Sequence, residues 1–131
     1  MLRRVKIDHN TATVDGGGMF VDDGTALVAE DSIIANNIAG GNGGGIENLG
    51  ETVLRHTKII DNQAGNNGGG ALNQTSGTLT LFATKVVKNT AANSGGGIFN
   101  DAGIVELNTA TGTTVIKNRP NNCVDVPGCA G

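Results

Sequence analysis

The sequence predicts an all-β chain folded as a parallel β-solenoid of about four to five coils, with about 25 to 29 residues in each coil. Three observations lead to this: a recurring Gly-Gly-Gly phrase, an Asn that recurs at a fixed distance before it, and a composition that disfavours helices. The four glycine phrases begin at Gly16, Gly43, Gly68 and Gly95, so they are 27, 25 and 27 positions apart. A period of this size corresponds to one supersecondary unit and predicts stacked repeats.

Each period contains three short apolar runs separated by Gly, Asn or Asp, which tolerate left-handed turn conformations. One run follows the glycine phrase, as in Ile98-Phe99; the next follows a later glycine, as in 78–81; the third precedes the recurring Asn, as in Ile59-Ile60. Glycine costs about 1 kcal/mol at a helix-interior position relative to Ala, and every period carries several glycines. We therefore expect three strands in each coil and a triangular cross-section.

Strand alternation sorts the residues after each glycine phrase into two columns. The inward column is predicted to be Met19, Ile46, Ala71 and Ile98. The outward column is predicted to be Phe20, Glu47, Leu72 and Phe99. Aromatic rings on a flat β-face can stack on sugars or anchor a protein, so this outward column is the candidate ligand-binding surface. The alternative is that these side chains pack under loops or stand singly on the surface.

Asparagines recur at two places in each coil, and stacked Asn side chains can hydrogen-bond from coil to coil. The longer ladder is predicted to contain Asn10, Asn37, Asn62, Asn89 and Asn118. The shorter ladder is predicted to contain Asn48, Asn73 and Asn100, with Val21 in the Asn position of the first copy. Both ladders are interpreted as structural.

The repeats are predicted to cover residues 1–118, and residues 119–131 to form a C-terminal cap or tail. Cys123 and Cys129 lie close together in this tail beside Pro and Gly, so they can close a small disulfide loop; two free thiols are the alternative. The N-terminal residues match the third strand of a coil and no cap precedes them. An open β-edge favours further coils or self-association, so we expect a C-terminal piece of a longer solenoid or a chain built to associate.

Composition excludes several classes of function. The formal net charge is −3 and no basic stripe is visible in the sequence, so nucleic acid is not an expected partner. No run of 18 apolar residues is present, so no membrane-spanning helix is expected. The first residues also lack the apolar segment of a secretory signal.

The acidic and histidine residues are the candidate catalytic or metal-binding groups. The acids are densest at Asp15, at Asp22-Asp23 and at Glu30-Asp31, but no Lys or Arg is expected at the matching column of an adjacent coil, so we interpret them as turn residues. His9 and His56 fall in different columns without a third ligand at zinc spacing. No catalytic residue, metal or cofactor is therefore predicted.

Each repeat contains the phrase Gly-Gly-Gly-Ile-X-Asn or a variant of it, then an apolar segment such as residues 77–81, and then a Val/Ile pair before Asn. This order resembles the repeats of right-handed, single-stranded parallel β-helix proteins. The chain is most similar to the polymorphic outer membrane protein type of repeat within the wider pectin-lyase-like fold. The ending from Asn122 to Cys129 resembles the terminus of similar secreted proteins from actinobacteria. Val21 and Glu47 depart from the pattern, and so does the missing signal sequence.

The resemblance implies an extracellular or cell-surface bacterial protein, here a fragment or the product of a mis-started frame. It favours a non-catalytic module for adhesion or for binding a carbohydrate or a cell-surface protein. One alternative is a fragment of a pectin-lyase-like polysaccharide-degrading enzyme. Another is an ice-binding solenoid, which is disfavoured because the Thr residues do not keep one column from coil to coil.

Overall fold

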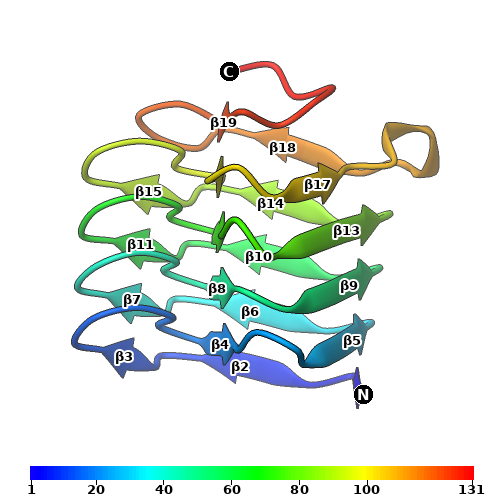
Figure 1. Cartoon of the computed structure of the whole chain (residues 1–131), viewed down its shortest axis with the longest axis horizontal. Helices are drawn as coiled ribbons and strands as arrows, with labels where there is room; N and C mark the ends of the chain where they lie inside the picture. The colour runs from blue at the N-terminus through cyan, green and yellow to red at the C-terminus, as the bar shows by residue number, and fades with distance from the viewer.

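The computed structural model describes residues 1–131. The chain winds into a right-handed parallel β-solenoid of about five turns, and Figure 1 shows the coils stacked from the N-terminal end in blue to the C-terminal end in red. Every strand pairs only with strands of the preceding and following coils, and all pairs are parallel. The predicted fold class is confirmed.

Four parallel sheets, named here A to D in the order in which the chain visits them, form the sides of the solenoid. Sheet A contains β1 (Leu2–Arg3), β5 (Ala26–Glu30), β9 (Glu51–Arg55), β13 (Thr78–Phe82) and β17 (Ile104–Glu106). Sheet B contains β2 (Lys6–Asp8), β6 (Ile33–Ala35), β10 (Lys58–Ile60), β14 (Lys85–Val87) and β18 (Thr114–Ile116). Sheet C contains β3 (Thr11–Ala12), β7 (Ile38–Ala39), β11 (Gln63–Ala64) and β15 (Thr90–Ala91). Sheet D contains β4 (Met19–Val21), β8 (Ile46–Asn48), β12 (Ala71–Asn73), β16 (Ile98–Asn100) and β19 (Cys123–Val124). A single 3₁₀ turn, η1 (Thr109–Thr111), lies between β17 and β18.

The expectation of three strands per coil is wrong, because sheet C supplies a fourth strand. Its strands have only two residues each, of which one Ala points inward. A strand of two residues with one inward Ala produces almost no apolar pattern in the sequence, so these strands were not expected. Sheet C carries the chain from the recurring Asn toward the glycine phrase.

The inside of the solenoid is filled by aliphatic columns, one or two from each sheet. Ile46, Ala71 and Ile98 are fully buried as predicted, whereas Met19 in the first coil is only partly buried. Sheets A and B add further buried columns of Leu, Ile, Val and Ala, including Leu54, Leu81, Ile34, Ile59 and Val86. The core is thus built almost without aromatic side chains.

Two Asn ladders run along the inside of the corners. In the longer ladder, the backbone N–H and the side-chain amide of Asn62 both donate to Oδ1 of Asn89 at 3.0 Å, and the same pair of bonds links every successive rung. In the shorter ladder, the amide of Asn48 donates to Asn73 at 2.8 Å and that of Asn73 to Asn100 at 3.0 Å. These bonds satisfy buried amides that would otherwise destabilise the fold.

A third polar column was not predicted from the sequence. It lies at the corner between sheets A and B and contains Ser32, Thr57, Thr84 and Thr113, all buried. The hydroxyl of Thr84 donates to the carbonyl of Phe82 at 2.9 Å and accepts from the N–H of Thr57 at 3.4 Å. Each member follows a residue with positive φ, such as His56 (46°) or Ala83 (45°), which turns the chain from one sheet to the next.

Residues 119–131, expected to be a cap or tail, contribute a strand to the solenoid. This strand, β19, extends sheet D by pairing with β16, and Asn122 accepts the last bonds of the longer Asn ladder from Asn118. Cys123 and Cys129 form a disulfide with a Cα–Cα distance of 6.2 Å, and Cys123 is buried in the core. At the opposite end, β1 to β4 each pair with a strand on one side only.

Candidate functional site

The predicted ligand column stacks in register but does not form an exposed surface. Phe20 pairs with Glu47, Glu47 with Leu72, and Leu72 with Phe99 on adjacent strands of sheet D. Phe20 is 53% exposed, but Glu47 and Leu72 are only 1% and 2% exposed, and Phe99 is half-buried. The interpretation of this column as a continuous ligand-binding face is therefore corrected: its two middle members are not accessible.

The glycine phrases explain why the column is covered, because the loop from sheet C to sheet D folds back over the outside of sheet D. The first glycine of each phrase has positive φ, 68° at Gly68, and lies directly over the column. A Cβ added to Gly68 would stand 2.8 Å from Cβ of Leu72, and one added to Gly95 would stand 2.8 Å from Cβ of Phe99. Glycine is required here both for the backbone conformation and for this close approach.

Glu47 is a buried carboxyl under this loop. Its Oε1 accepts a hydrogen bond of 2.7 Å from the side-chain amide of Gln74, and its Oε2 has no partner. The pKa of Glu47 is raised to about 7, chiefly because the carboxyl is buried; the Gln74 bond lowers the pKa, and the nearby carboxylates of Asp15 and Asp101 add to the increase. The residue that departed from the sequence pattern is thus a covered and destabilising group, not a surface contact.

The outer face of sheet A is the widest uncovered β-surface of the molecule. Its central strands β5, β9 and β13 have five residues each, so three columns of side chains point outward from them. The middle column holds Val28, Val53, Thr80 and Glu106, and the column nearer sheet D holds Ala26, Glu51, Thr78 and Ile104. No outer column of this sheet repeats Thr, so the flat face lacks the Thr rows that an ice-binding solenoid needs.

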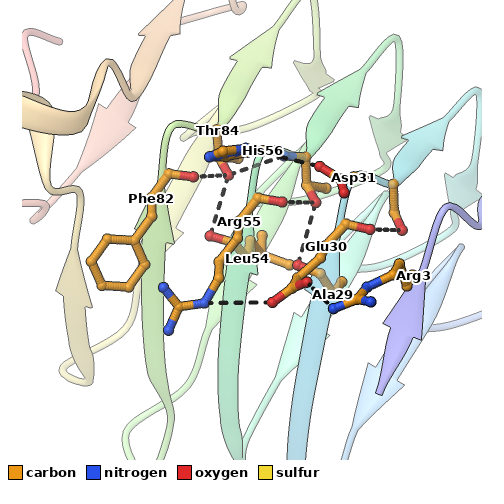
Figure 2. A network of polar contacts seen from close by, with 11 residues as sticks. Arg3, Ala29, Glu30, Asp31, Leu54, Arg55, His56, Phe82 and Thr84 are labelled. Atoms are coloured by element: carbon orange, nitrogen blue, oxygen red, sulfur yellow. Dashed lines mark hydrogen bonds and ion pairs between the residues drawn. The ribbon is translucent and has the colours of Figure 1, made fainter.

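The third outer column, at the edge of sheet A next to sheet B, brings together Arg3, Glu30, Arg55 and Phe82 from four successive coils (Figure 2). Glu30 lies between two guanidinium groups, with Arg3 at 3.0 Å and Arg55 at 4.0 Å. The guanidinium of Arg55 also stacks over the ring of Phe82, 4.6 Å from its centroid. The expectation that no Arg occurs beside the acidic residues in adjacent coils is therefore wrong.

A polar depression of about 210 Å³ adjoins this column at the corner between sheets A and B. It is lined by Glu30, Asp31, Arg55 and His56. His56 Nδ1 lies 3.8 Å from Asp31 Oδ1, and both side chains are largely exposed. Figure 2 shows that the buried hydroxyl column, which includes Thr84, hydrogen-bonds to the backbone below these side chains.

A second polar depression, of about 310 Å³, lies at the other edge of sheet A, beside sheet D. Its lining carries acidic and hydroxyl groups, among them Asp23, Thr25, Glu51, Ser76 and Thr78. The open face of sheet A is thus bordered on both long sides by hydrogen-bonding groups. A surface of this kind offers donors, acceptors and apolar side chains together, which suits a ligand with many hydroxyl groups.

Several of the other acidic and histidine residues make local contacts. The carbonyl of Asp22 accepts the Thr25 hydroxyl in a turn, and Asp15 Oδ1 accepts the N–H of Asn42 at 2.7 Å. His9 Nδ1 lies 3.0 Å from Asp8, and this hydrogen bond lowers the pKa of Asp8. His9 sits at the corner between sheets B and C, away from His56. No group of three or more His, Cys, Asp or Glu side chains is placed to hold a metal ion.

The charged column of sheet A had a signal in the sequence that was missed. Starting from Arg3 and adding 27, 25 and 27, the offsets of the glycine phrases, gives Glu30, Arg55 and Phe82. Applying the period to every residue, and not only to the glycine and asparagine motifs, would have found the row.

Comparison with known protein families, with curated proteins and with solved structures finds no match for this chain. No helix in the structure combines the length and the apolar character needed to cross a membrane.

Proposed function

We propose that this chain is a non-catalytic, secreted or cell-surface module that binds a hydroxyl-rich carbohydrate chain along the outer face of sheet A. The observation that carries the proposal is the row of Arg3, Glu30, Arg55 and Phe82, in which one charged or aromatic side chain from each of four coils lines a flat, open strip. Coils repeat about every 4.8 Å, so an extended polymer lying along the solenoid axis meets one such group at every coil.

The chemistry of the strip supports a carbohydrate over an apolar peptide. Guanidinium, carboxylate and imidazole groups donate to and accept from hydroxyls, while the Phe82 ring and the half-buried Val28 and Val53 offer apolar surface to the C–H faces of a sugar. Glu30 pairs with both Arg3 and Arg55, and the one positive charge left in the row is offset by Asp31 in the adjoining depression, so the strip does not demand an ionic ligand.

Secretion is supported by two features. The Cys123–Cys129 disulfide is of the kind that persists in oxidising compartments. The repeat phrase also resembles that of the polymorphic outer membrane protein and pectin-lyase-like β-helix proteins, many of which act at cell surfaces.

The polysaccharide-degrading alternative is favoured by one observation, the approach of Glu30 and Asp31 to Arg55 and His56 in the next coil. Acidic and basic groups in adjacent coils are what general acid–base chemistry on a sugar chain requires. The binding assay below separates the two functions when release of shorter sugars is followed in the same samples.

The test is binding of the protein to a panel of neutral polysaccharides, such as glucans, mannan and chitin oligosaccharides, by affinity electrophoresis and calorimetry. With the ligand found, Phe82→Ala and Arg55→Gln should each lower the affinity about tenfold or more, because they remove a ring or a hydrogen-bonding fork from the centre of the strip. Phe99→Ala is the matched control, since it deletes the same ring from the covered column of sheet D, and its affinity should be unchanged.

Two results would overturn the proposal. One is binding that is lost in Phe99→Ala or Phe20→Ala but kept in Phe82→Ala, because it would place the ligand on sheet D. The other is no binding to any polysaccharide in the panel. Release of shortened sugars that disappears in Glu30→Gln would instead establish the enzymatic alternative.

A further inference from the structure

A basic depression of about 580 Å³ lies at the corner between sheets B and C, in the last two coils. It is lined by Lys88, Thr90, Lys117, Asn118 and Arg119, without any carboxylate or apolar side chain. Lys88 is 29 residues before Lys117 and 31 before Arg119, so the sequence alone does not show that the three cations lie together. The coil stacking brings them together, and none of them belongs to the face of sheet A.

The cations of this depression lack the partners that other cations of the molecule have. Arg3 and Arg55 approach Glu30, and Lys6 approaches Asp8. Lys88, Lys117 and Arg119 take part in no ion pair. Asp61, which precedes Lys88 in the same corner column, makes no ion pair with it either.

Lys88 and Lys117 are also neighbours of like charge. Val87 and Ile116 are register partners on β14 and β18, so the two lysines that follow them occupy the same corner column one coil apart. Both have positive φ, 56° and 59°, which fixes their Cα atoms at the corner. Like charges opposite each other on adjacent strands are destabilising, unless an anion lies between them.

The backbone beneath these cations is held in place from inside the solenoid. Asn89 donates twice to Oδ1 of Asn118, and Asn118 donates to the carbonyl of Val86 at 2.9 Å. Thr90 and Arg119 form a parallel bridge, and the N–H of Ala91 donates to the carbonyl of Arg119 at 2.9 Å. The Thr90 hydroxyl makes no hydrogen bond within the protein, so it is free to donate to a ligand.

We propose that this depression is an anion-binding site for a sulfate or phosphate group, held by Lys88, Lys117 and Arg119 with a hydrogen bond from the Thr90 hydroxyl. A tetrahedral oxyanion presents several acceptors at once, which fits a guanidinium fork and two ammonium groups that approach from one corner. The anion comes either from the free inorganic ion or from a sulfated or phosphorylated polysaccharide. Nucleic acid is disfavoured because the depression offers no aromatic side chain on which a base could stack.

The test titrates the folded protein at low ionic strength with sodium sulfate, sodium phosphate and dextran sulfate, with uncharged dextran as the ligand control. The wild-type protein should bind at least one of the anionic probes, and the observed affinity should fall as salt is raised. The double variant Lys88→Gln/Lys117→Gln should bind about tenfold more weakly or worse. Arg4→Gln removes an exposed, unpaired cation from the other end of the solenoid and should bind within about twofold of wild type by the same reasoning.

The two sources of the anion are separated by the probes. Equal responses to inorganic sulfate and dextran sulfate support a site for the free ion, whereas a response to dextran sulfate alone supports a polymer-borne group. Thermal unfolding of the double variant shows whether it is folded, and since the lysines repel each other we expect no loss of stability.

Three results would contradict the proposal. The first is no binding of any anionic probe by the wild-type protein at low salt. The second is an equal loss of binding in Arg4→Gln, which would mean a diffuse charge effect. The third is binding to a short single-stranded oligothymidylate that is tighter than to dextran sulfate and is lost in the double variant.

Discussion

Sheets A and D both have outward-pointing columns, but on sheet D the two middle residues of the column are buried, whereas on sheet A the columns reach solvent. On sheet D the glycine loop that arrives from sheet C lies across the strands and buries Glu47 and Leu72. On sheet A the chain enters through a short turn and leaves at the corner with sheet B, so nothing crosses the outer face of β5, β9 and β13. Strand alternation therefore tells which side of a sheet a residue occupies, but the path of the adjoining loop decides whether that side is accessible.

The largest effect expected from this difference is on stability. Leu72→Ala on the covered column of sheet D should lower the free energy of unfolding by about 3 kcal/mol, because it leaves a cavity under a loop that glycine backbone holds close. Val53→Ala changes an outward-pointing residue in the middle column of sheet A. It should lower the free energy of unfolding by about 1 kcal/mol or less, because water already reaches this side chain. Chemical denaturation of both variants measures the difference; losses of equal size would mean that the loop does not cover sheet D.

A pH-dependent effect should also be confined to the covered column. The pKa of Glu47 is about 7 in the folded protein against an ordinary value of 4.5, so the folded state holds its proton more tightly than the unfolded state. Below about pH 4.5 the carboxyl is protonated in both states and costs nothing. As pH rises from 4.5 to 7 the unfolded state is favoured progressively, and above 7 the full penalty is up to about 3 kcal/mol.

Glu47→Gln should therefore raise the melting temperature clearly at pH 8 and hardly at pH 4, while keeping an acceptor for Gln74. Glu51→Gln, an exposed carboxylate on sheet A, is the control and should change little at either pH. Melting curves of both variants and of the wild-type protein, recorded from pH 4 to pH 8, measure these differences. A pH-independent difference between Glu47→Gln and the wild-type protein would show that the pKa of Glu47 is not raised under the loop.

The periodic parts of the molecule could be predicted from the sequence. The glycine offsets place Ile46, Ala71 and Ile98 in one buried column, and the Asn offsets place Asn37, Asn62 and Asn89 in one ladder, because a parallel in-register solenoid repeats each position once per coil. A residue type that bonds to its own copy in the next coil, such as Asn, leaves the clearest pattern.

The features that could not be predicted are those in which no single residue type recurs from coil to coil. Sheet C has strands of two residues, too short for an apolar pattern. The cover over Glu47 depends on the direction that the positive-φ glycines give the loop. The rows on sheet A and at the basic corner mix residue types, so they emerge only when neighbours such as Glu30 and Arg55, or Lys88 and Lys117, are placed one coil apart.

We have proposed that the ligand surface lies on sheet A and not on sheet D. The most direct test is a ¹⁵N–¹H NMR titration of the protein with the polysaccharide fragment that it binds, following the backbone amides of all strands. We expect the largest chemical-shift changes in β5, β9 and β13 and at the corner that carries Asp31 and His56, with β8, β12 and β16 unchanged. Chemical-shift changes centred on Phe20, Phe99 and the glycine loops, without changes in sheet A, would contradict the proposal.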